Sequence, residues 1–390
     1  MQIYNGLRVL YVGSPPLFEK GASSIHMMKM CQAMSNLGIQ VELVLPGNFS
    51  KKRLFDYYSV KPNFEVKTIR FTDKFARQIL HGIFSSFYAR SNRKKYDFVM
   101  TRNIVFAYIA TVYVGIPTIY DAHHPPVNKS AVAMLKTFIQ SKYFMGMSFN
   151  SNGLLKLYSK AGIVPQNSVV AHNGVEIEKF DVGADKNELR KNLNIPRNSI
   201  IVTYSGNTYE GRGIEYIIQV ARYMKDVEFL IVGGSEKDNH VYKLFVKQIG
   251  ITNIKFTGFV DHKKVADYLL ASDILLMPYT RNVTIKGGTD AYQFTSPIKL
   301  FEYMAAERPI IASSIPSVME ILKDGMNSVI IEPGNGEELA KTIRGLIKDK
   351  NIALFIAKNA RREVSKYTWE KRVEKIISGL KITEKLNIKH

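Results

Sequence analysis

The stretch "TYSGNTYEGRGIEYIIQVA", residues 203–221, contains the unit from which the fold is built. An apolar strand runs into a glycine turn, and a helical pattern begins near Gly213. Short apolar strands alternate with helical patterns in the same way along the rest of the chain. Because such alternation is typical of parallel α/β layers, the sequence predicts an α/β protein with parallel sheets.

The predicted strands form two series. The first consists of "LRVLYVG", "VELVLPG", "YDFVMTR", "PTIYDAH", "FMGMSFN" and "SVVAHNG"; the second consists of "IIVTYSG", "EFLIVGG", "IKFTGFV", "ILLMPY", "PIIAS" and "SVIIEP". Between them, residues 177–199 carry no strong apolar run and look like a linker followed by a small helix. A chain of 390 residues is too long for one ordinary core. We therefore expect two Rossmann-like domains that face a cleft.

Composition places the chain among folded soluble proteins, with 46% hydrophobic and 23% charged residues. The single cysteine, Cys31, excludes an internal disulfide framework, and no Cys/His cluster has zinc spacing. The N-terminus lacks the order of a signal peptide. Gly115 and Pro117 interrupt the most membrane-like run, residues 104–120, which we interpret as a buried helix and a short strand. A cytoplasmic protein without a transmembrane segment is expected.

The net charge of +20 is concentrated in part of the chain. Residues 51–102 contain 13 Lys and Arg against 4 Asp and Glu. Such a region points to an anionic surface such as a membrane, although a solubilising surface gives the same count. Residues 74–95 place apolar side chains at helical spacing between basic residues, which fits either an interfacial membrane helix or a helix facing the core. That stripe consists of Phe75, Ile79, Leu80, Ile83, Phe84, Phe87 and Tyr88.

The stretch "FTSPIKLFEYMAAERPIIAS", residues 294–313, predicts a helix with Ser296 as its N-cap and Pro297 at its first position. Lys299 then lies in the first turn, where a cation opposes the helix dipole. Two explanations are open. Lys299 pairs with Glu302, which contributes only about 0.2–0.5 kcal/mol, or the helix start receives an anion.

The turn from Gly206 to Gly213 resembles a P-loop only superficially, because Arg212 and Gly213 replace the lysine and the Ser/Thr that such NTPases need. A helix start with a flexible turn and an arginine suits a phosphate, although a plain structural turn would look alike. Arg212 and Lys299 both follow strand ends, so together they predict a diphosphate site, with Glu302 placed to accept bonds from a ribose. The sequence has no Asp-x-Asp triplet, so we expect neither a metal nor a cofactor.

These residues carry a family resemblance. The chain resembles the retaining GT-B glycosyltransferases of family 4 over nearly its whole length. The motifs are "EKGASSIH", "DAHHPP", "AHNGVEIEKF", "SGNTYEGRG", "FTGFV", "ASDILLMPY", "SPIKLFEYMAAERPIIAS" and "YTWEKRVEKI". The resemblance implies an acceptor-side domain at residues 1–178 and a nucleotide-sugar-binding domain at 179–366. A C-terminal helix at about 367–390 would cross back onto the first domain.

The resemblance also implies site residues. In the family, a Gly-Arg and a Lys-Gly flank the turn, and both cations bind the donor diphosphate; here Arg212 matches the lysine and Asn207 stands where the arginine is usual. The family's two paired glutamates correspond to Phe294 and Glu302 in this sequence. Phe294 and Thr295 are therefore candidates for sugar recognition. A Ser-Pro-x-Lys-x-x-Glu variant would let Lys299 supply the missing cation. The implied donor-binding set is Gly21, Gly206, Asn207, Ser296, Pro297, Ile298 and Glu302.

In the first domain, "EKGASSIH" matches the family's glycine loop, where Gly21 would allow close backbone approach before a helix start. His26 is interpreted as a packing residue within that helix. His123 ends the strand "PTIYDAH" and matches the family's histidine beside the reacting sugar carbon, so with Arg212 and Lys299 it forms the catalytic set. His124 and Arg102, at the same sheet edge, are candidate acceptor contacts.

The function implied is a metal-independent, retaining transfer of a hexose-type sugar. The donor would be a nucleoside-diphosphate sugar, and the acceptor a glycan or lipid-linked saccharide of cell-surface polysaccharide or glycolipid synthesis. Peripheral association with the inner face of the membrane would involve residues 51–102. Two alternatives stay open: a related sugar-nucleotide epimerase or phosphorylase, and a non-enzymatic binder of anionic surfaces with a degenerate donor site. No nucleic-acid-binding signature is present.

Overall fold

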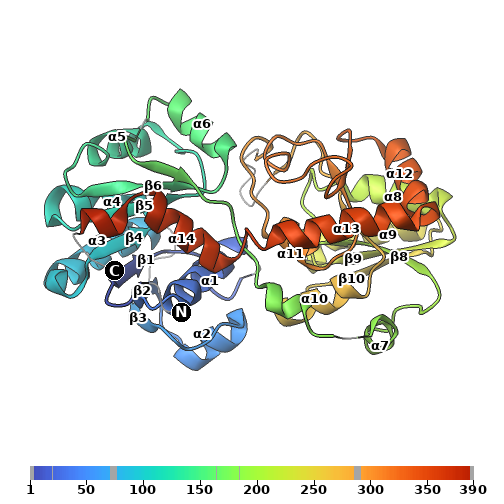
Figure 1. The fold of residues 1–390 in the computed structure, drawn as a ribbon, viewed down its shortest axis with the longest axis horizontal. Helices are drawn as coiled ribbons and strands as arrows, with labels where there is room; N and C mark the ends of the chain where they lie inside the picture. Colours follow the sequence, from blue (N-terminus) through green and yellow to red (C-terminus); the bar gives the residue numbers. More distant parts are fainter. Residues whose placement is uncertain are drawn as a thin grey trace. The chain divides into compact units, whose positions relative to one another are not determined.

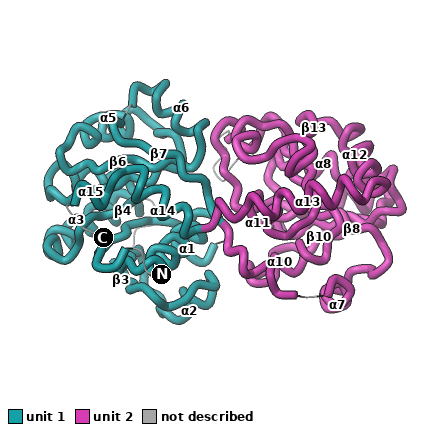
Figure 2. The backbone as a smooth tube through the Cα atoms, in the orientation of Figure 1, with its two compact units in different colours: residues 1–174, 369–390 teal, residues 175–368 magenta. Residues whose placement is uncertain are grey.

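A computed structural model of the chain describes residues 4–19, 21–70, 77–163, 165–183, 185–284 and 291–386. The chain divides into two compact units (Figure 2). Unit 1 comprises Met1–Gly174 together with Trp369–His390, and unit 2 comprises Val175–Thr368. The expected boundaries at 178/179 and 366/367 lie a few residues from these.

Unit 1 is built on a seven-stranded sheet in the order β3-β2-β1-β4-β5-β6-β7, with parallel pairing throughout (Figure 1). Its strands are β1 (Arg8–Val12), β2 (Gln40–Pro46), β3 (Glu65–Ile69), β4 (Phe98–Thr101), β5 (Thr118–Ala122), β6 (Phe144–Phe149) and β7 (Ser168–Val170). Its helices are α1 (Ala22–Asn36), α2 (Lys51–Tyr58), α3 (Arg77–Ser91), η1 (Arg93–Lys95), α4 (Ile104–Ile109), the π-helical η2 (Ala110–Val114), α5 (Lys129–Phe138), α6 (Asn152–Lys160), α14 (Trp369–Gly379) and α15 (Ile382–Lys385).

Unit 2 has a six-stranded parallel sheet in the order β10-β9-β8-β11-β12-β13. Its strands are β8 (Ile200–Ser205), β9 (Val227–Val232), β10 (Ile254–Gly258), β11 (Ile274–Met277), β12 (Ile310–Ser313) and β13 (Val329–Ile331). Its helices are η3 (Ile177–Phe180), α7 (Lys186–Asn192), α8 (Ile214–Tyr223), α9 (Glu236–Gln248), α10 (His262–Leu270), α11 (Ile298–Ala305), α12 (Gly336–Lys348) and α13 (Lys350–Val364).

The prediction of two parallel-sheet α/β domains is confirmed, and each predicted strand is present. The strand β3 was missed because it alternates buried Val66 with the charged Glu65 and Lys67, as an edge strand does. The buried helix and strand predicted for residues 104–120 correspond to α4, η2 and β5. Among the described helices, none combines the length and the apolar character needed to cross a bilayer.

One local prediction is wrong, and one that was left open is partly resolved. Ser296 is not the N-cap of α11, because the helix begins at Ile298 with the extended residue Pro297 at the cap position. A residue before proline avoids the helical region, which keeps Ser296 outside the helix. The apolar stripe of α3 is divided: Tyr88 packs against the core of unit 1, whereas Ile79, Phe84 and Phe87 are exposed. Phe75 lies outside the described residues.

The turn that joins β8 to α8 depends on a glycine. Gly213 is the N-cap of α8, as the sequence predicted, and its φ of 76° is a conformation that other residues avoid. A Cβ atom at Gly213 would lie 1.9 Å from the carbonyl oxygen of Pro278. Neither backbone segment can yield easily, so this turn requires glycine.

We therefore predict that Gly213→Ala lowers the free energy of unfolding by about 1–3 kcal/mol, the usual cost of local backbone strain, with the steric overlap adding to it. Gly345→Ala is a matched control, because Gly345 lies within α12 and its Cβ would meet nothing within 4 Å. That substitution should stabilise the protein by roughly 0.5–1 kcal/mol. Urea unfolding of both variants measures the difference, and equal effects would contradict the steric argument.

Candidate functional site

The sheet of unit 2 reverses its strand order between β8 and β11. In open parallel sheets, loops diverge at such a point and leave room for a ligand at the carboxyl ends of the strands. Gly206 directly follows β8, and Tyr279 lies two residues after β11. The residues predicted to bind a diphosphate lie beside these two strand ends.

The two predicted cations converge on one aromatic ring. The Lys299 ammonium lies 3.8 Å from the ring centre of Tyr204 and 5.2 Å from that of Tyr279. The Arg212 guanidinium lies 4.6 Å from the Tyr279 ring centre and donates a hydrogen bond to the carbonyl of Thr284 at 2.9 Å. Arg212 and Lys299 therefore share one site.

Gly206 makes the position of Lys299 sterically allowed. Gly206 has a φ of 128°, and a Cβ atom there would lie 2.6 Å from Lys299 Nζ and 2.8 Å from Cε. The carbonyl of Asn207, the next residue, accepts a hydrogen bond of 2.5 Å from the Tyr204 hydroxyl. The backbone turn and the aromatic ring under the ammonium are thus tied together.

Lys299 holds a buried charge that lacks a counterion. Within the described residues, Lys299 Nζ is buried without a hydrogen-bond partner, and no ion pair joins it to Glu302. The Glu302 carboxylate instead lies 3.4 Å from Nε2 of His262, the first residue of α10. Burial, and then the Arg212 guanidinium, lower the pKa of Lys299 well below its usual range. An anion at this point would relieve both effects.

The other predicted donor residues surround the start of α11. Ser296 and Pro297 precede the helix, and Ile298 is its first residue. Phe294 and Thr295 lie just before, in a turn where both backbone amides donate to the carbonyl of Ala291. The Phe294 side chain is only 3% exposed and points into the protein interior.

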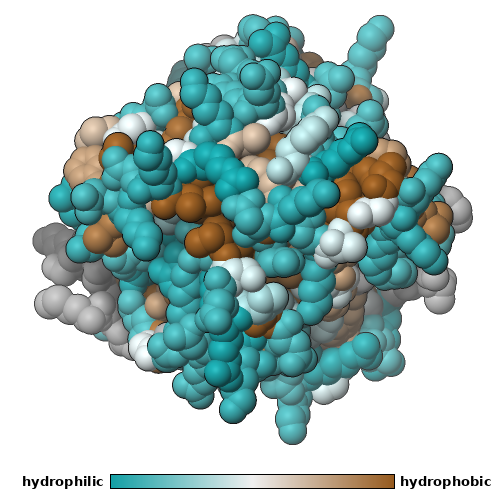
Figure 3. Space-filling model, turned by 90° about the vertical axis from the view of Figure 1, so that its right-hand side faces the viewer, coloured by the Kyte–Doolittle hydropathy of each residue, from teal (hydrophilic) through white to brown (hydrophobic). Residues whose placement is uncertain are grey.

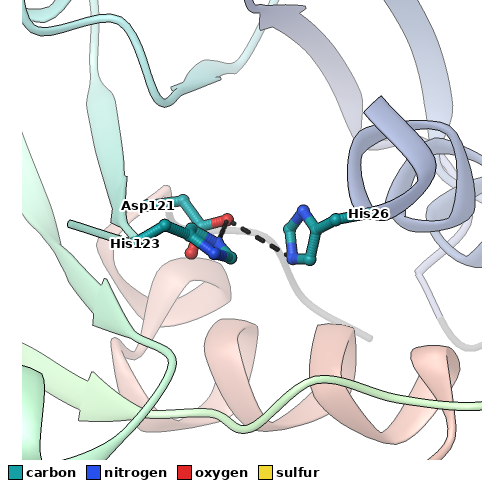
Figure 4. Close-up of side chains that lie close together, drawn as sticks. All are labelled: His26, Asp121 and His123. Carbon is teal, nitrogen blue, oxygen red and sulfur yellow. Dashed lines mark hydrogen bonds and ion pairs between the residues drawn. The ribbon is translucent and has the colours of Figure 1, made fainter. Parts of the chain in front are cut away.

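A second cluster lies in unit 1, around His123, which follows β5 (Figure 4). Its Nε2 atom lies 2.9 Å from the Asp121 carboxylate. The His26 ring, from α1, lies 4.3 Å from the His123 ring, and its Nε2 is 3.8 Å from Asp121. His26 does lie within a helix, as predicted, but beside the predicted catalytic histidine.

Of the remaining predicted residues of unit 1, only some lie close to the cluster around His123. Arg102, after β4, donates to the carbonyl of Ser23 at 3.2 Å and approaches Nδ1 of His26 at 3.5 Å. His124 follows His123, and its carbonyl accepts a bond from Tyr158. Gly21 is the N-cap of α1 with a φ of −104°, and a Cβ there would meet nothing within 4 Å. Nothing in the described structure requires a glycine at that position.

The histidines of this cluster are uncharged at neutral pH. Burial, and then the Arg102 guanidinium, lower the pKa of His123 to about 3 and that of His124 to about 4. Because a carboxylate can only accept, a neutral His123 must donate its Nε2 proton to Asp121. Its Nδ1 atom then carries the lone pair, 3.4 Å from the Asn150 amide nitrogen.

His26, Asp121 and His123 are residue types that bind metals, and their ligand atoms lie within 4.8 Å of one another. The surrounding charges oppose a cation. The Asp121 carboxylate already accepts bonds from His123, from Ser148 at 2.6 Å and from the Arg372 guanidinium at 2.8 Å. The Asp121 carboxylate thus already has three hydrogen-bonding partners, and the Arg372 guanidinium beside it would repel a divalent ion.

Sequence reasoning missed several residues of both sites. Tyr204 and Tyr279 each stand at or near the end of a predicted strand, beside a predicted cation. Asp121 is a charged residue inside an apolar strand, and Arg372 lies on the apolar stripe of "WEKRVEKII". A buried charge on each of two elements was a signal that they pair.

Residues 185–363, which lie within unit 2, match the family described as "Glycosyl transferases group 1". An uncharacterized glycosyltransferase of Methanocaldococcus jannaschii is 23% identical over 227 residues, which cover 56% of this chain and 55% of that protein. The chain thus spans about half the length of the curated relatives it matches.

Solved structures match nearly the whole chain. Anabaena HepE, solved with UDP and with UDP-glucose, has a TM-score of 0.74 at 18% identity, covering 96% of this chain and at least 99% of HepE. Sucrose-phosphate synthase from Thermosynechococcus elongatus has a TM-score of 0.75 at 17% identity, covering 98% and 99%. The two units therefore have the GT-B fold of these glycosyltransferase structures.

The unpartnered ammonium of Lys299 has a consequence for stability. Lys299→Met keeps the aliphatic length and removes the buried charge, so we predict that it raises the free energy of unfolding by about 1–3 kcal/mol near pH 7. The folded-state pKa is depressed, so once the pH rises above it the unfolded chain binds more protons than the folded protein, and the cost of the buried charge falls. The gain should shrink as the pH rises towards about 10.4, the pKa of an unfolded lysine.

Denaturant unfolding of the wild type and the variant at several pH values measures this gain. Lys341→Met, on the exposed side of α12, is the control and should change stability by no more than about 0.5 kcal/mol. A Lys299→Met protein that is less stable than the wild type, or a gain that does not depend on pH, would contradict the assigned charge state.

Proposed function

We propose that this protein is a retaining glycosyltransferase that uses a nucleoside-diphosphate sugar as donor. It would transfer the sugar to a hydroxyl of a glycan or lipid-linked saccharide. The observation that carries the proposal is the pair Arg212 and Lys299 at one aromatic ring, with the Lys299 ammonium buried and without a hydrogen-bond partner in the described residues.

A diphosphate fits this site better than other anions do. Two cations of different geometry, a planar guanidinium and a compact ammonium, can each bind a phosphoryl group. The start of α11 would add backbone N–H groups that have no partner within the helix, since Lys299 is the second residue of that helix. Glu302, on the next turn, is suited to accept hydrogen bonds from ribose hydroxyls.

The chemistry follows from these charges. As the bond between the anomeric carbon and the diphosphate breaks, negative charge grows on the departing oxygen, and Arg212 and Lys299 would stabilise it. Among the residues that the structure describes, no carboxylate is placed as a nucleophile at this site, so we propose that the acceptor oxygen forms the new bond on the same face and passes its proton to the departing phosphate. This course needs no metal. By resemblance, His123 would contact the sugar near the reacting carbon.

Two comparisons with other proteins support a particular class of donor. Unit 2 carries the group 1 family match over residues 185–363, and Anabaena HepE was solved with UDP and UDP-glucose. A uridine diphosphate sugar is therefore the first donor to test. Phe294 and Thr295 stay candidates for sugar recognition through the backbone turn that they form.

We predict that isothermal calorimetry detects binding of UDP, or of GDP or ADP, to the wild type. Lys299→Met and Arg212→Met should each weaken that binding by about 10- to 100-fold, because a hydrogen bond to a charged group contributes about 1.5–3 kcal/mol. Lys341→Met should bind as the wild type does. No binding of any of the three nucleotides, with the protein folded, would refute a donor site.

Activity is then tested by screening sugar nucleotides against lipid-linked and soluble saccharide acceptors. Product NMR should give an anomeric configuration identical to that of the donor. An inverted product would refute the proposed stereochemistry. Epimerisation or hydrolysis of the sugar nucleotide that does not depend on any acceptor would instead favour the other class of enzyme considered for this sequence.

A membrane-associated acceptor is supported by the way α3 packs. The helix buries small or polar residues, namely His81, Gly82, Ser85, Ser86 and Ala89. Three of its large apolar side chains are exposed: Ile79 is 54% exposed, Phe84 44% and Phe87 63%. These three positions lie on adjoining rows of one helix face.

Exposed apolar residues occur elsewhere, and the face in Figure 3 has several separate apolar clusters among hydrophilic side chains. What distinguishes α3 is the adjacent charge, since exposed Arg90, Arg93 and Lys94 follow the apolar face directly. Apolar side chains beside cations are the combination that binds an anionic bilayer surface. We therefore include peripheral membrane binding through α3 in the proposal.

We predict that the protein sediments with vesicles containing phosphatidylglycerol and not with vesicles of phosphatidylcholine alone. Phe84→Ser/Phe87→Ser should weaken that binding at least about tenfold, because each ring contributes about 1.5–3 kcal/mol when it leaves water. The control is Leu354→Ser/Phe355→Ser on α13, where both side chains are also about half exposed. Equal losses in the two double variants would show that α3 is not the binding face.

A further inference from the structure

The candidate histidine of unit 1 is held by a residue that lies far along the chain. Arg372, in α14, is 3% exposed, and its guanidinium donates to Asp121 Oδ1 at 2.8 Å. The other carboxylate oxygen, Oδ2, is the one that His123 contacts at 2.9 Å. The three side chains therefore form one buried line from α14 through β5 to His123.

We propose that Arg372 is a positioning residue for His123, acting through Asp121: it holds Asp121 as a fixed anion, which keeps His123 neutral with its proton on Nε2. This deepens the proposed function, on which the catalytic role of His123 rests.

The hydrogen bonds leave little freedom to Asp121. Oδ1 accepts from Arg372 and from the Ser148 hydroxyl at 2.6 Å, so only Oδ2 is left for His123. Burial alone would raise the pKa of Asp121, but His123 and Arg372 lower it well below its usual range. An ionised carboxylate can accept a hydrogen bond but cannot donate one. His123 must therefore carry its proton on Nε2, the nitrogen that faces Asp121.

Packing fixes the position of Arg372 itself. A second guanidinium nitrogen donates to the carbonyl of His172 at 3.1 Å, and α14 packs against α1. One turn before Arg372, the Trp369 ring contacts the His26 ring at 5.3 Å. The residues of α14 therefore contact two members of the histidine cluster.

The charged and titratable groups that face His123 come from several elements. They are His26 of α1, Arg102 after β4, Asp121 of β5 and Arg372 of α14, with Tyr11 of β1 close to Asp121 and Arg372. Only Asp121 is an anion. Removing Arg372 would leave this anion with a histidine as its main partner, so the Asp121–His123 pair would take up a proton at a higher pH than in the wild type.

The test is a measurement of histidine tautomers. Imidazole ¹⁵N NMR of the full chain distinguishes the Nε2–H, Nδ1–H and doubly protonated forms, and His123→Gln assigns its signals among the eight histidines. In the wild type we expect a neutral His123 with the proton on Nε2 down to about pH 5. In Arg372→Met, the pair should protonate at least about one pH unit higher, or His123 should populate both neutral tautomers.

Three controls separate positioning from folding. Arg372→Lys keeps a cation but loses the second nitrogen, and should give an intermediate shift. Lys371→Met removes an exposed cation from the same helix and should change nothing. UDP affinity, measured on the nucleotide site of unit 2, should be unaltered in every variant, while kcat falls about tenfold or more in Arg372→Met.

Several results would overturn the proposal. One is a folded Arg372→Met protein, judged by circular dichroism and thermal unfolding, whose His123 titrates and tautomerises as in the wild type. A kcat loss accompanied by equal loss of UDP affinity would indicate a global effect. Stoichiometric Zn²⁺ binding that His26→Gln abolishes would make the cluster a metal centre. Because the NMR readout needs no turnover, the proposed activity could fail while this inference stands.

Discussion

A cation held without an anion is the feature on which the site in unit 2 depends. The Lys299 ammonium lies against the face of Tyr204, whose ring quadrupole offsets part of the cost of burial. Because Gly206 has no side chain, the end of the Lys299 side chain can lie at this point without having to shift. The reversal of strand order between β8 and β11 then places the backbone turn, the aromatic rings and the start of α11 at one edge of the sheet. The backbone turn, the aromatic rings and the start of α11 therefore all lie next to the Lys299 ammonium.

The alternation of apolar strands and helices predicted most of the fold, because buried parallel strands are apolar throughout and stand out in the sequence. Strand β3 escaped notice because one of its faces meets solvent. The start of α11 was misjudged because Ser296 has the composition of an N-cap but precedes a proline. For the α3 helix, the sequence did not distinguish an interfacial membrane helix from a helix that faces the core. Periodicity identifies an apolar face but does not show what that face contacts.

Of the candidate sites, sequence reasoning found the cations and the strand-end histidine but not what holds them. Arg212 and Lys299 were recognisable because a cation at a helix start opposes the dipole and requires a reason. Tyr204 and Tyr279 were not, because an aromatic residue at a strand end is usually part of the core. The pairing of Asp121 with Arg372 joins positions separated by 251 residues. The sequence shows a charged residue within each apolar element, but it does not show that these two residues meet.

The order of the chain through the two units has a consequence for synthesis. Unit 2 is continuous, from Val175 to Thr368, so all of it leaves the ribosome before unit 1 receives its final helix. Until α14 emerges, Asp121 lacks its guanidinium partner, and the α1 surface that α14 covers stays open to water. Nascent chains therefore pass through a state in which unit 2 is complete and unit 1 is not. In a chain arrested before Trp369, the buried Asp121 and its histidine neighbours would lack the helix that covers them, which would expose the chain to quality control.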